Sequence, residues 1–158
     1  MKKLFVVLIS LFILTSCSKA EEVSQKASDF SLKNLEGKTV TLSEYKNKVV
    51  IINFWATWCP PCRAELPDFV KFYNEYKSKG VEIIGITVNS KAPEVQSMVT
   101  QYKIEYPICM SDKKVEADYG GIRGVPTTLI IDKAGNIVTK RIGIIKEKEL
   151  VDIVKKLL

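Results

Sequence analysis

The sequence predicts an α/β fold with a central sheet, and three observations carry this prediction. Residues 49–55 form an apolar, β-branched run, which is typical of a strand buried on both faces, and residues 81–88 are expected to form a second buried strand. Between them lies a segment with helical spacing of apolar residues that ends at Gly80. A strand, a helix and a second strand in this order form a right-handed parallel unit. The chain of 158 residues is long enough for one such domain.

The segment before this unit predicts a β-hairpin, laid before the main sheet as an N-terminal extension. Alternating apolar residues at 27–32 and 39–42 flank a turn signal at 34–38. Ser43 is expected to cap a short helical turn that ends at Tyr45.

The remaining elements complete a mixed sheet flanked by helices. The first helix is expected from Cys59 or Pro60 to Lys79, bent or restarted at Pro67 because proline removes an N–H and crowds the preceding turn. Pro107 within a short strand favours an edge position for that strand. The other expected elements are helices at 93–102, 113–119 and 147–158 and strands at 106–110, 127–131 and 137–142, the last two joined by a turn at 132–136.

A C-P-P-C motif follows the first buried strand directly, with Cys59 and Cys62 at its ends. A C-x-x-C where a strand passes into a helix is typical of a redox pair, because the two sulfurs can join as a disulfide or separate as thiols. The free N–H groups and dipole at the helix N-terminus favour Cys59 as a thiolate, the reactive form.

Two structural roles for this motif are weaker alternatives. A disulfide that closes so small a loop restrains the unfolded chain by only about 2 kcal/mol, against about 3 kcal/mol for a fifteen-residue loop. A zinc site needs four nitrogen or sulfur ligands, whereas the chain has no histidine and no second C-x-x-C. We therefore expect redox chemistry and no metal.

Residues 1–16 have the proportions of a signal peptide. Lys2 and Lys3 precede an apolar stretch of eleven residues, which is too short to span a bilayer comfortably. The sequence L-T-S-C that ends at Cys17 resembles a bacterial lipobox, which implies cleavage before Cys17 and lipid on this residue. Ordinary secretion, with Cys17 as a spare thiol, is the alternative. Residues 17–26 are polar and predict a flexible tether, and residues 27–158 form the domain.

Charge and cysteine content narrow the class of protein. Removing Lys2 and Lys3 lowers the formal net charge from +6 to +4, and the remaining lysines are scattered rather than clustered, so nothing indicates nucleic-acid binding. Lipidation would hold the domain on the membrane surface of the cell envelope, outside the cytoplasm. In that oxidising space a dedicated partner normally keeps a C-x-x-C in one redox state.

Two blocks of the sequence resemble the same protein family. Residues 53–67 read N-F-W-A-T-W-C-P-P-C-R-A-E-L-P, and residues 124–128 read G-V-P-T-T. With the predicted order of elements over residues 27–158, they are similar to the thioredoxin-like fold, in its TlpA/ResA-type branch of membrane-tethered thiol–disulfide oxidoreductases. This branch overlaps in sequence with the AhpC/TSA group.

The resemblance implies a role for each matching residue. Cys59 would be the attacking thiol, Cys62 the resolving thiol and Glu65 the acidic residue below the pair. Pro126 would be a cis-proline beside the disulfide, with the Val125 backbone available to pair with a substrate. The surface offered to a partner would comprise Trp58, Pro60, Pro61, Val125 and Pro126.

Several of these residues have a plainer alternative. Glu65 could be an early-helix glutamate that interacts with the dipole in solvent, and Arg63 could merely decorate the helix. Asn53 departs from the buried aspartate of classical thioredoxins, and an amide cannot shuttle a proton. Trp55 is expected in the core, and Cys109 is expected to be a small buried apolar residue rather than a third redox thiol.

The sequence thus predicts an enzyme that exchanges disulfides without metal or organic cofactor. The resemblance implies protein disulfides as substrates, apocytochrome c among them, and a membrane electron donor for re-reduction. A thiol peroxidase of the AhpC/TSA type is one rival, although Thr57 stands two residues before Cys59 where the peroxidase pattern has three. A non-enzymatic module that binds partners through the thioredoxin surface or buffers metal is the other rival, and the missing histidines weaken metal binding.

Overall fold

The computed structural model describes residues 25–158, and it confirms an α/β fold with a mixed central sheet. The expected signal peptide and Cys17 lie outside these residues. Two strands, β2 (Ser31–Lys33) and β3 (Thr39–Thr41), form the predicted hairpin. The main sheet has six strands: β1 (Gln25–Lys26), β4 (Val49–Trp55), β5 (Val81–Thr87), β6 (Ile108–Met110), β7 (Thr127–Ile131) and β8 (Asn136–Ile142).

The main sheet has the strand order β1-β8-β7-β4-β5-β6. Strand β4 pairs in parallel with β5, and β5 with β6, whereas β7 is antiparallel to both β4 and β8. Every residue of β4 and β5 is buried, because these central strands are covered on both faces. The strand that follows Pro107 lies at an edge, as predicted.

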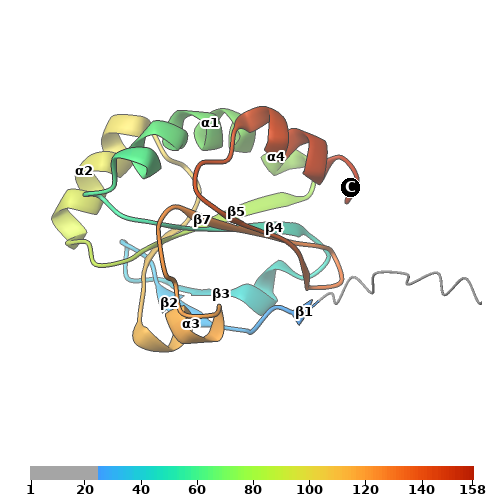
Figure 1. Cartoon of the computed structure of the whole chain (residues 1–158), viewed down its shortest axis with the longest axis horizontal. Helices are drawn as coiled ribbons and strands as arrows, with labels where there is room; N and C mark the ends of the chain where they lie inside the picture. Colours follow the sequence, from blue (N-terminus) through green and yellow to red (C-terminus); the bar gives the residue numbers. More distant parts are fainter. Residues whose placement is uncertain (1–24) are drawn as a thin grey trace, which may run out of the picture.

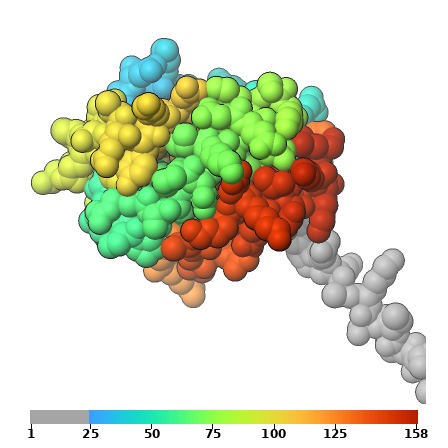
Figure 2. All heavy atoms as spheres, turned by 90° about the horizontal axis from the view of Figure 1, so that it is seen from above, coloured from blue at the N-terminus to red at the C-terminus, as the bar shows by residue number. Residues whose placement is uncertain are grey.

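Helices cover the two faces unequally. Figure 1 places α1, α2 and α4 above the sheet, and α3 with the β2–β3 hairpin below it. From above, α1 (green) lies between α2 (yellow) and the C-terminal segment that contains α4 (red), and it contacts both helices (Figure 2). The helices are α1 (Pro60–Tyr76), α2 (Ala92–Tyr102), α3 (Lys113–Asp118) and α4 (Glu147–Val154), with 3-10 turns η1 (Leu42–Tyr45) and η2 (Lys77–Lys79).

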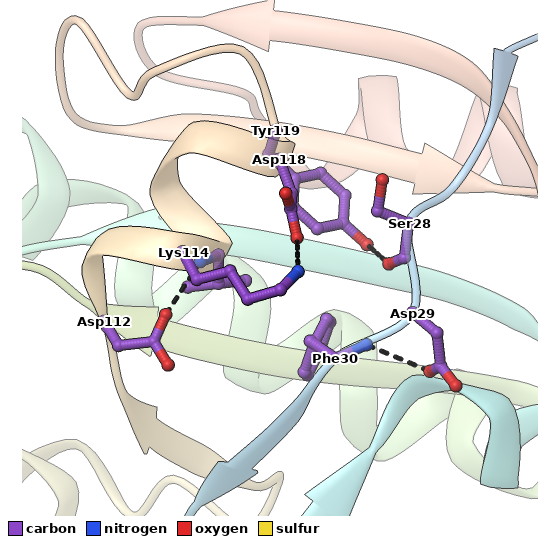
Figure 3. Close-up of polar contacts among 8 residues, drawn as sticks. Ser28, Asp29, Phe30, Asp112, Lys114, Asp118 and Tyr119 are labelled. Atoms are coloured by element: carbon purple, nitrogen blue, oxygen red, sulfur yellow. Dashed lines mark hydrogen bonds and ion pairs between the residues drawn. The ribbon is translucent and has the colours of Figure 1, made fainter.

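The N-terminal hairpin is held to the lower face by α3 and the residue after it. The Tyr119 hydroxyl donates a hydrogen bond of 2.7 Å to the Ser28 carbonyl, and its ring packs edge-on against Phe30. Asp29 accepts from the Phe30 N–H, and Asp112 caps α3 at Val115 (Figure 3). These contacts explain why the extension is part of the domain rather than an appendage.

Residues 17–26 were predicted to form a flexible tether, and this prediction is wrong for its last two residues. Gln25 and Lys26 form β1, which pairs antiparallel with Ile137 and Asn136 of β8. Both residues are exposed, so the strand has no apolar alternation that the sequence could reveal. The pairing depends on backbone groups at the open edge of β8.

Three helix predictions also need correction. Helix α1 passes through Pro67 without the restart, which was one of the two expected alternatives to an undisturbed helix; Pro67 and Arg63 both face solvent, where water can bind the carbonyl that lacks its partner. The helix predicted to reach Leu158 ends at Val154 and continues only as a turn. Ser43 does not cap its turn: the turn begins at Leu42, and Asp29 accepts the Ser43 N–H at 3.0 Å.

Replacing Phe72 by alanine is expected to lower the free energy of unfolding by about 3 to 5 kcal/mol, because the cavity cannot refill. Phe72 is fully buried on the sheet-facing side of α1 and stacks on Tyr76 at a centroid distance of 4.6 Å. Denaturant unfolding of the oxidised protein measures the change. Asn74→Ala on the exposed side of the same helix should stay within about 0.5 kcal/mol of the parent, and an equal loss in both variants would contradict the expectation.

Candidate redox site

The cysteine pair lies where β4 passes into α1. Cys59 is the N-cap residue, and the backbone N–H of Cys62 donates to its sulfur at 3.2 Å. Pro60 and Pro61 open the helix, where a missing N–H costs nothing. Cys59 and Cys62 form a disulfide, with Cα atoms 5.3 Å apart. Cys59 is 3 % exposed and Cys62 is 0 % exposed, so a partner can reach the pair only through Cys59.

A cis peptide bond between Val125 and Pro126 faces this disulfide, as the resemblance implied. The Val125 carbonyl oxygen lies 3.5 Å from the Cys59 sulfur. The Thr127 hydroxyl donates to the Gly124 carbonyl at 2.7 Å, which ties the loop to the start of β7. A backbone edge therefore lies next to the sulfur that a substrate must approach.

Hydrogen bonds to Asn89 and Ser90 hold the loop that carries Trp58 in place. The Trp58 ring is 57 % exposed, and its indole N–H donates to the Asn89 carbonyl at 3.0 Å. The Thr57 N–H donates to the Ser90 hydroxyl at 3.1 Å, and the Arg63 guanidinium donates to the Thr57 carbonyl at 3.1 Å. Arg63 thus does more than decorate the helix, because it holds the residue two positions before Cys59.

Glu65 is fully buried, which excludes the alternative of a solvent-exposed glutamate. Its two carboxylate oxygens accept from the Asn53 side-chain amide at 2.9 Å and from the Ile145 backbone N–H at 3.3 Å. Burial raises the pKa of the Glu65 carboxyl from 4.5 to about 7, although these hydrogen bonds act in the opposite direction. The carboxyl can therefore hold or release a proton near neutral pH.

Asn53 orients this carboxyl group. The Asn53 amide nitrogen also lies 3.1 Å from the Thr128 hydroxyl, while its oxygen has no hydrogen-bond partner among the described residues. The structure therefore gives the amide a positioning role that sequence reasoning missed. Trp55 is fully buried, as expected. Cys109 is also fully buried on β6, and burial raises the pKa of its thiol to about 11, so it stays protonated and unreactive.

Sequence reasoning missed an apolar segment beside the cis-proline loop. The Gly143 N–H donates to the Pro126 carbonyl at 2.8 Å, which brings the end of β8 against this loop. Ile142 is 63 % exposed and Ile144 is 39 % exposed. We call the exposed or half-buried apolar residues around Cys59 the apolar rim; its members are Trp58, Pro60, Pro61, Val125, Ile142 and Ile144.

Comparison with known proteins agrees with this geometry. The AhpC/TSA family model matches residues 23–140. The chain belongs to the AhpC/TSA family. It is 39% identical over 134 residues to the thiol-disulfide oxidoreductase ResA of Halalkalibacterium halodurans, covering 83% of this chain and 76% of that protein. It is 39% identical over 128 residues to the thioredoxin-like protein YneN of Bacillus subtilis, covering 80% and 75% of the two chains.

A solved structure extends the comparison to the fold of this AhpC/TSA-family protein. A thioredoxin-family thiol:disulfide interchange protein from Chlorobium tepidum superposes with a TM-score of 0.81 at 34% identity, over 87% of this chain and 99% of the other. The protein is a thiol–disulfide oxidoreductase with a thioredoxin-like fold. Within residues 25–158, no helix is long and apolar enough to cross a bilayer.

Replacing Ile142 by glutamate in this AhpC/TSA-family protein should lower kcat/KM for a protein disulfide about five- to ten-fold, because a buried apolar contact at an interface centre is worth 1 kcal/mol or more. Turnover of a small disulfide, which cannot reach Ile142, should be unchanged. Val138→Glu provides the matched control, since Val138 is an exposed apolar residue of the same strand, four positions away from Ile142. Equal losses in the two variants would exclude the rim as a docking surface.

Proposed function

We propose that this protein reduces disulfides of other proteins on the outer side of a bacterial membrane, to which lipid on Cys17 anchors it. The observation that carries the proposal is the arrangement of one marginally exposed sulfur, Cys59, between a cis-proline backbone edge and an apolar rim. An extended segment of a partner chain can lie along Val125 and place its disulfide over Cys59. The lipobox-like L-T-S-C sequence supports the anchor.

The reaction proceeds in two exchange steps. The Cys59 thiolate attacks one sulfur of the partner disulfide, so a mixed disulfide forms and the first partner thiolate leaves. The Cys62 thiolate then attacks the Cys59 sulfur and releases the second partner thiolate. The partner gains two electrons and this protein ends as the Cys59–Cys62 disulfide. A membrane-bound dithiol donor must return two electrons to close the cycle.

Glu65 is the proton carrier for the buried thiol in this scheme. Cys62 is fully buried, so its thiol cannot exchange a proton directly with bulk water; Glu65, itself fully buried, lies three residues further along α1, about one helical turn away. With a pKa near 7 it can take the Cys62 proton before the second step and return it after re-reduction.

Haem-binding cysteine pairs of apocytochrome c are the substrates we propose. An unfolded chain exposes apolar side chains next to its cysteines, and the apolar rim is suited to such a segment. The similarity to proteins named thiol-disulfide oxidoreductase ResA supports a substrate that carries a disulfide.

Trapping with Cys62→Ser tests the proposal in cells. The variant lacks the resolving thiol, so substrates should remain joined to Cys59 by a disulfide that reducing agent releases. Mass spectrometry should then identify exported proteins with cysteine pairs, apocytochrome c among them. The Cys59→Ser/Cys62→Ser variant is the control and should capture nothing. Capture of peroxide-oxidised forms alone, with no partner protein, would overturn the proposal.

A further inference from the structure

The short loop between β4 and α1 is held through Thr57, whose three polar groups each bind a different side chain. The Thr57 backbone N–H donates to the Ser90 hydroxyl at 3.1 Å, and its carbonyl accepts from the Arg63 guanidinium at 3.1 Å. The Thr57 hydroxyl donates to a carboxylate oxygen of Glu94 at 3.0 Å. We call the three side chains that bind Thr57 the Thr57 clamp; they are Arg63, Ser90 and Glu94.

The number of hydroxyl protons decides which atom donates in each of these bonds. The Ser90 hydroxyl donates its only proton to the Val88 carbonyl at 3.0 Å, so it accepts from Thr57. The Thr57 hydroxyl lies 3.4 Å from the Ser90 hydroxyl and 3.0 Å from Glu94, and an ionised carboxylate can only accept. The Thr57 proton therefore goes to Glu94, and a hydrogen bond to a charged acceptor is stronger than one between neutral groups.

The members of the Thr57 clamp come from both sides of the loop. Arg63 belongs to α1, whereas Ser90 precedes α2 and Glu94 lies in its first turn. Helix α2 lies beside α1 (Figure 1). The Trp58 indole adds a bond to the same segment at the Asn89 carbonyl. The loop is therefore fixed by hydrogen bonds that do not involve either sulfur of the redox pair.

Reduction of the disulfide removes a covalent restraint on the Cys59 sulfur. In the oxidised protein this sulfur is bonded to Cys62 and accepts the Cys62 backbone N–H at 3.2 Å. The same N–H and the N-terminus of α1 stabilise a thiolate at this place. After reduction the sulfur keeps this position only if the backbone before Cys59 does not move, and that backbone is the one that Thr57 holds.

We propose that the Thr57 clamp positions the Cys59 thiolate for attack, so that Ser90 and Glu94 act on the reaction from outside the redox motif. The inference rests on the proposed role of Cys59 as the attacking thiol. Its effect has to be separated from that of charge, because α1 carries Arg63 and Glu65, and α2 carries Glu94. Residues 124–128 of the cis-proline loop carry no charge. Removal of the Glu94 charge alone favours a nearby thiolate, whereas loss of the Thr57 bond disfavours it.

Kinetics of the first exchange step test the Thr57 clamp. In a Cys62→Ser background, the reaction of Cys59 with a small aromatic disulfide is followed from pH 5 to pH 9, so that the profile belongs to one thiol. Thr57→Val removes the hydroxyl but keeps the shape, and it should raise the midpoint by about one pH unit. The rate at pH 6 should fall about three-fold, because a ten-fold loss of thiolate is partly offset by its greater nucleophilicity. Thr57→Ser keeps the hydroxyl and should restore the parental midpoint and rate.

Substitutions of Glu94 supply a second measurement that leaves no buried cavity, because this side chain is exposed. Glu94→Ala and Glu94→Gln both remove the charge, but only glutamine keeps an acceptor oxygen for Thr57. Glu94→Ala should therefore react about three-fold more slowly at pH 6, with a midpoint about one unit higher than that of Glu94→Gln. Thr100→Val, at an exposed threonine of α2, is the matched control and should react like the parent.

The outcomes separate the Thr57 clamp from the proposed function. Equal profiles within either pair, Thr57→Val with Thr57→Ser or Glu94→Ala with Glu94→Gln, would overturn the positioning role and leave Cys59 as the attacking thiol. A parental Cys62→Ser protein whose Cys59 does not react with the disulfide would overturn the proposed function itself.

Discussion

Replacing Cys59 by serine should lower the rate of disulfide exchange at least about 10³-fold, to the uncatalysed level, because a hydroxyl cannot supply the thiolate nucleophile. Cys59 is the sulfur with residual exposure and the one that faces the Val125 carbonyl. Cys62→Ser should still complete the first exchange step and stop at the mixed disulfide. Single-turnover kinetics with a fluorescent peptide disulfide separates the two steps.

The remaining cysteine of the domain provides the control for this prediction. Cys109→Ser should exchange disulfides at the parental rate, because the Cys109 thiol is fully buried and burial holds its pKa near 11. If Cys62→Ser were as inert in the first step as Cys59→Ser, the assignment of Cys59 as the attacking sulfur would have to be reversed.

Local patterns predicted the elements that hold the site. The predicted strand at 49–55 coincides with β4, and the one at 81–88 differs from β5 by a single residue. A run this rich in β-branched apolar residues is typical of a strand buried on both faces, so its central position in the sheet agrees with its composition. The helix was predicted to start at Cys59 or Pro60, and it begins at Pro60, because proline is favoured at the first helical position.

The surroundings of Glu65 could not be predicted in the same way. Its spacing from Cys62 places it one turn along the helix, but the Ile145 N–H that it accepts comes from a residue 80 positions away. The apolar rim could not be predicted for the same reason, because it also depends on a contact between distant segments. Ile142 reads as the end of a strand, and only the bond between the Gly143 N–H and the Pro126 carbonyl brings it to the site. Contacts between distant segments leave no periodic signal.

The cis bond between Val125 and Pro126 could be predicted only in part from the sequence. Residue type alone gives a low expectation, since about 5–6% of X–Pro bonds are cis. The G-V-P-T-T sequence raised that expectation through resemblance, and the structure confirms it. In the fold the Val125 carbonyl lies beside the Cys59 sulfur, and the Thr127 hydroxyl ties the loop to the start of β7.

Glu65→Gln should change how stability depends on pH. The pKa of Glu65 is about 7 in the folded protein and 4.5 when exposed. Between these values the native state binds a proton that the unfolded state has lost, so stability falls as pH rises through this window. The shift corresponds to about 3 kcal/mol, fully present as a destabilisation above pH 7. Glutamine carries no charge and should remove this loss.

Denaturant unfolding of the oxidised proteins from pH 5 to pH 8 measures the effect. The difference between Glu65→Gln and the parent should grow in favour of the variant by about 2 to 3 kcal/mol across that range. Glu75→Gln makes the same substitution at an exposed site of α1 and should show no such trend. Parallel stability curves for the parent and Glu65→Gln would mean that the buried carboxyl titrates at its ordinary pKa.

Glu65→Gln should also show whether Glu65 takes part in catalysis, independently of its effect on stability. If Glu65 takes the proton of the buried Cys62 thiol, Glu65→Gln should slow the resolving step about 10²- to 10⁴-fold, the usual contribution of a general base. The first step at Cys59 should proceed at nearly the parental rate, because that sulfur is the one open to solvent. The parental resolving rate should rise through pH 7 as the carboxylate forms, and the variant should lose this inflection. A variant with both steps slowed equally, and with the inflection intact, would assign Glu65 a structural role alone.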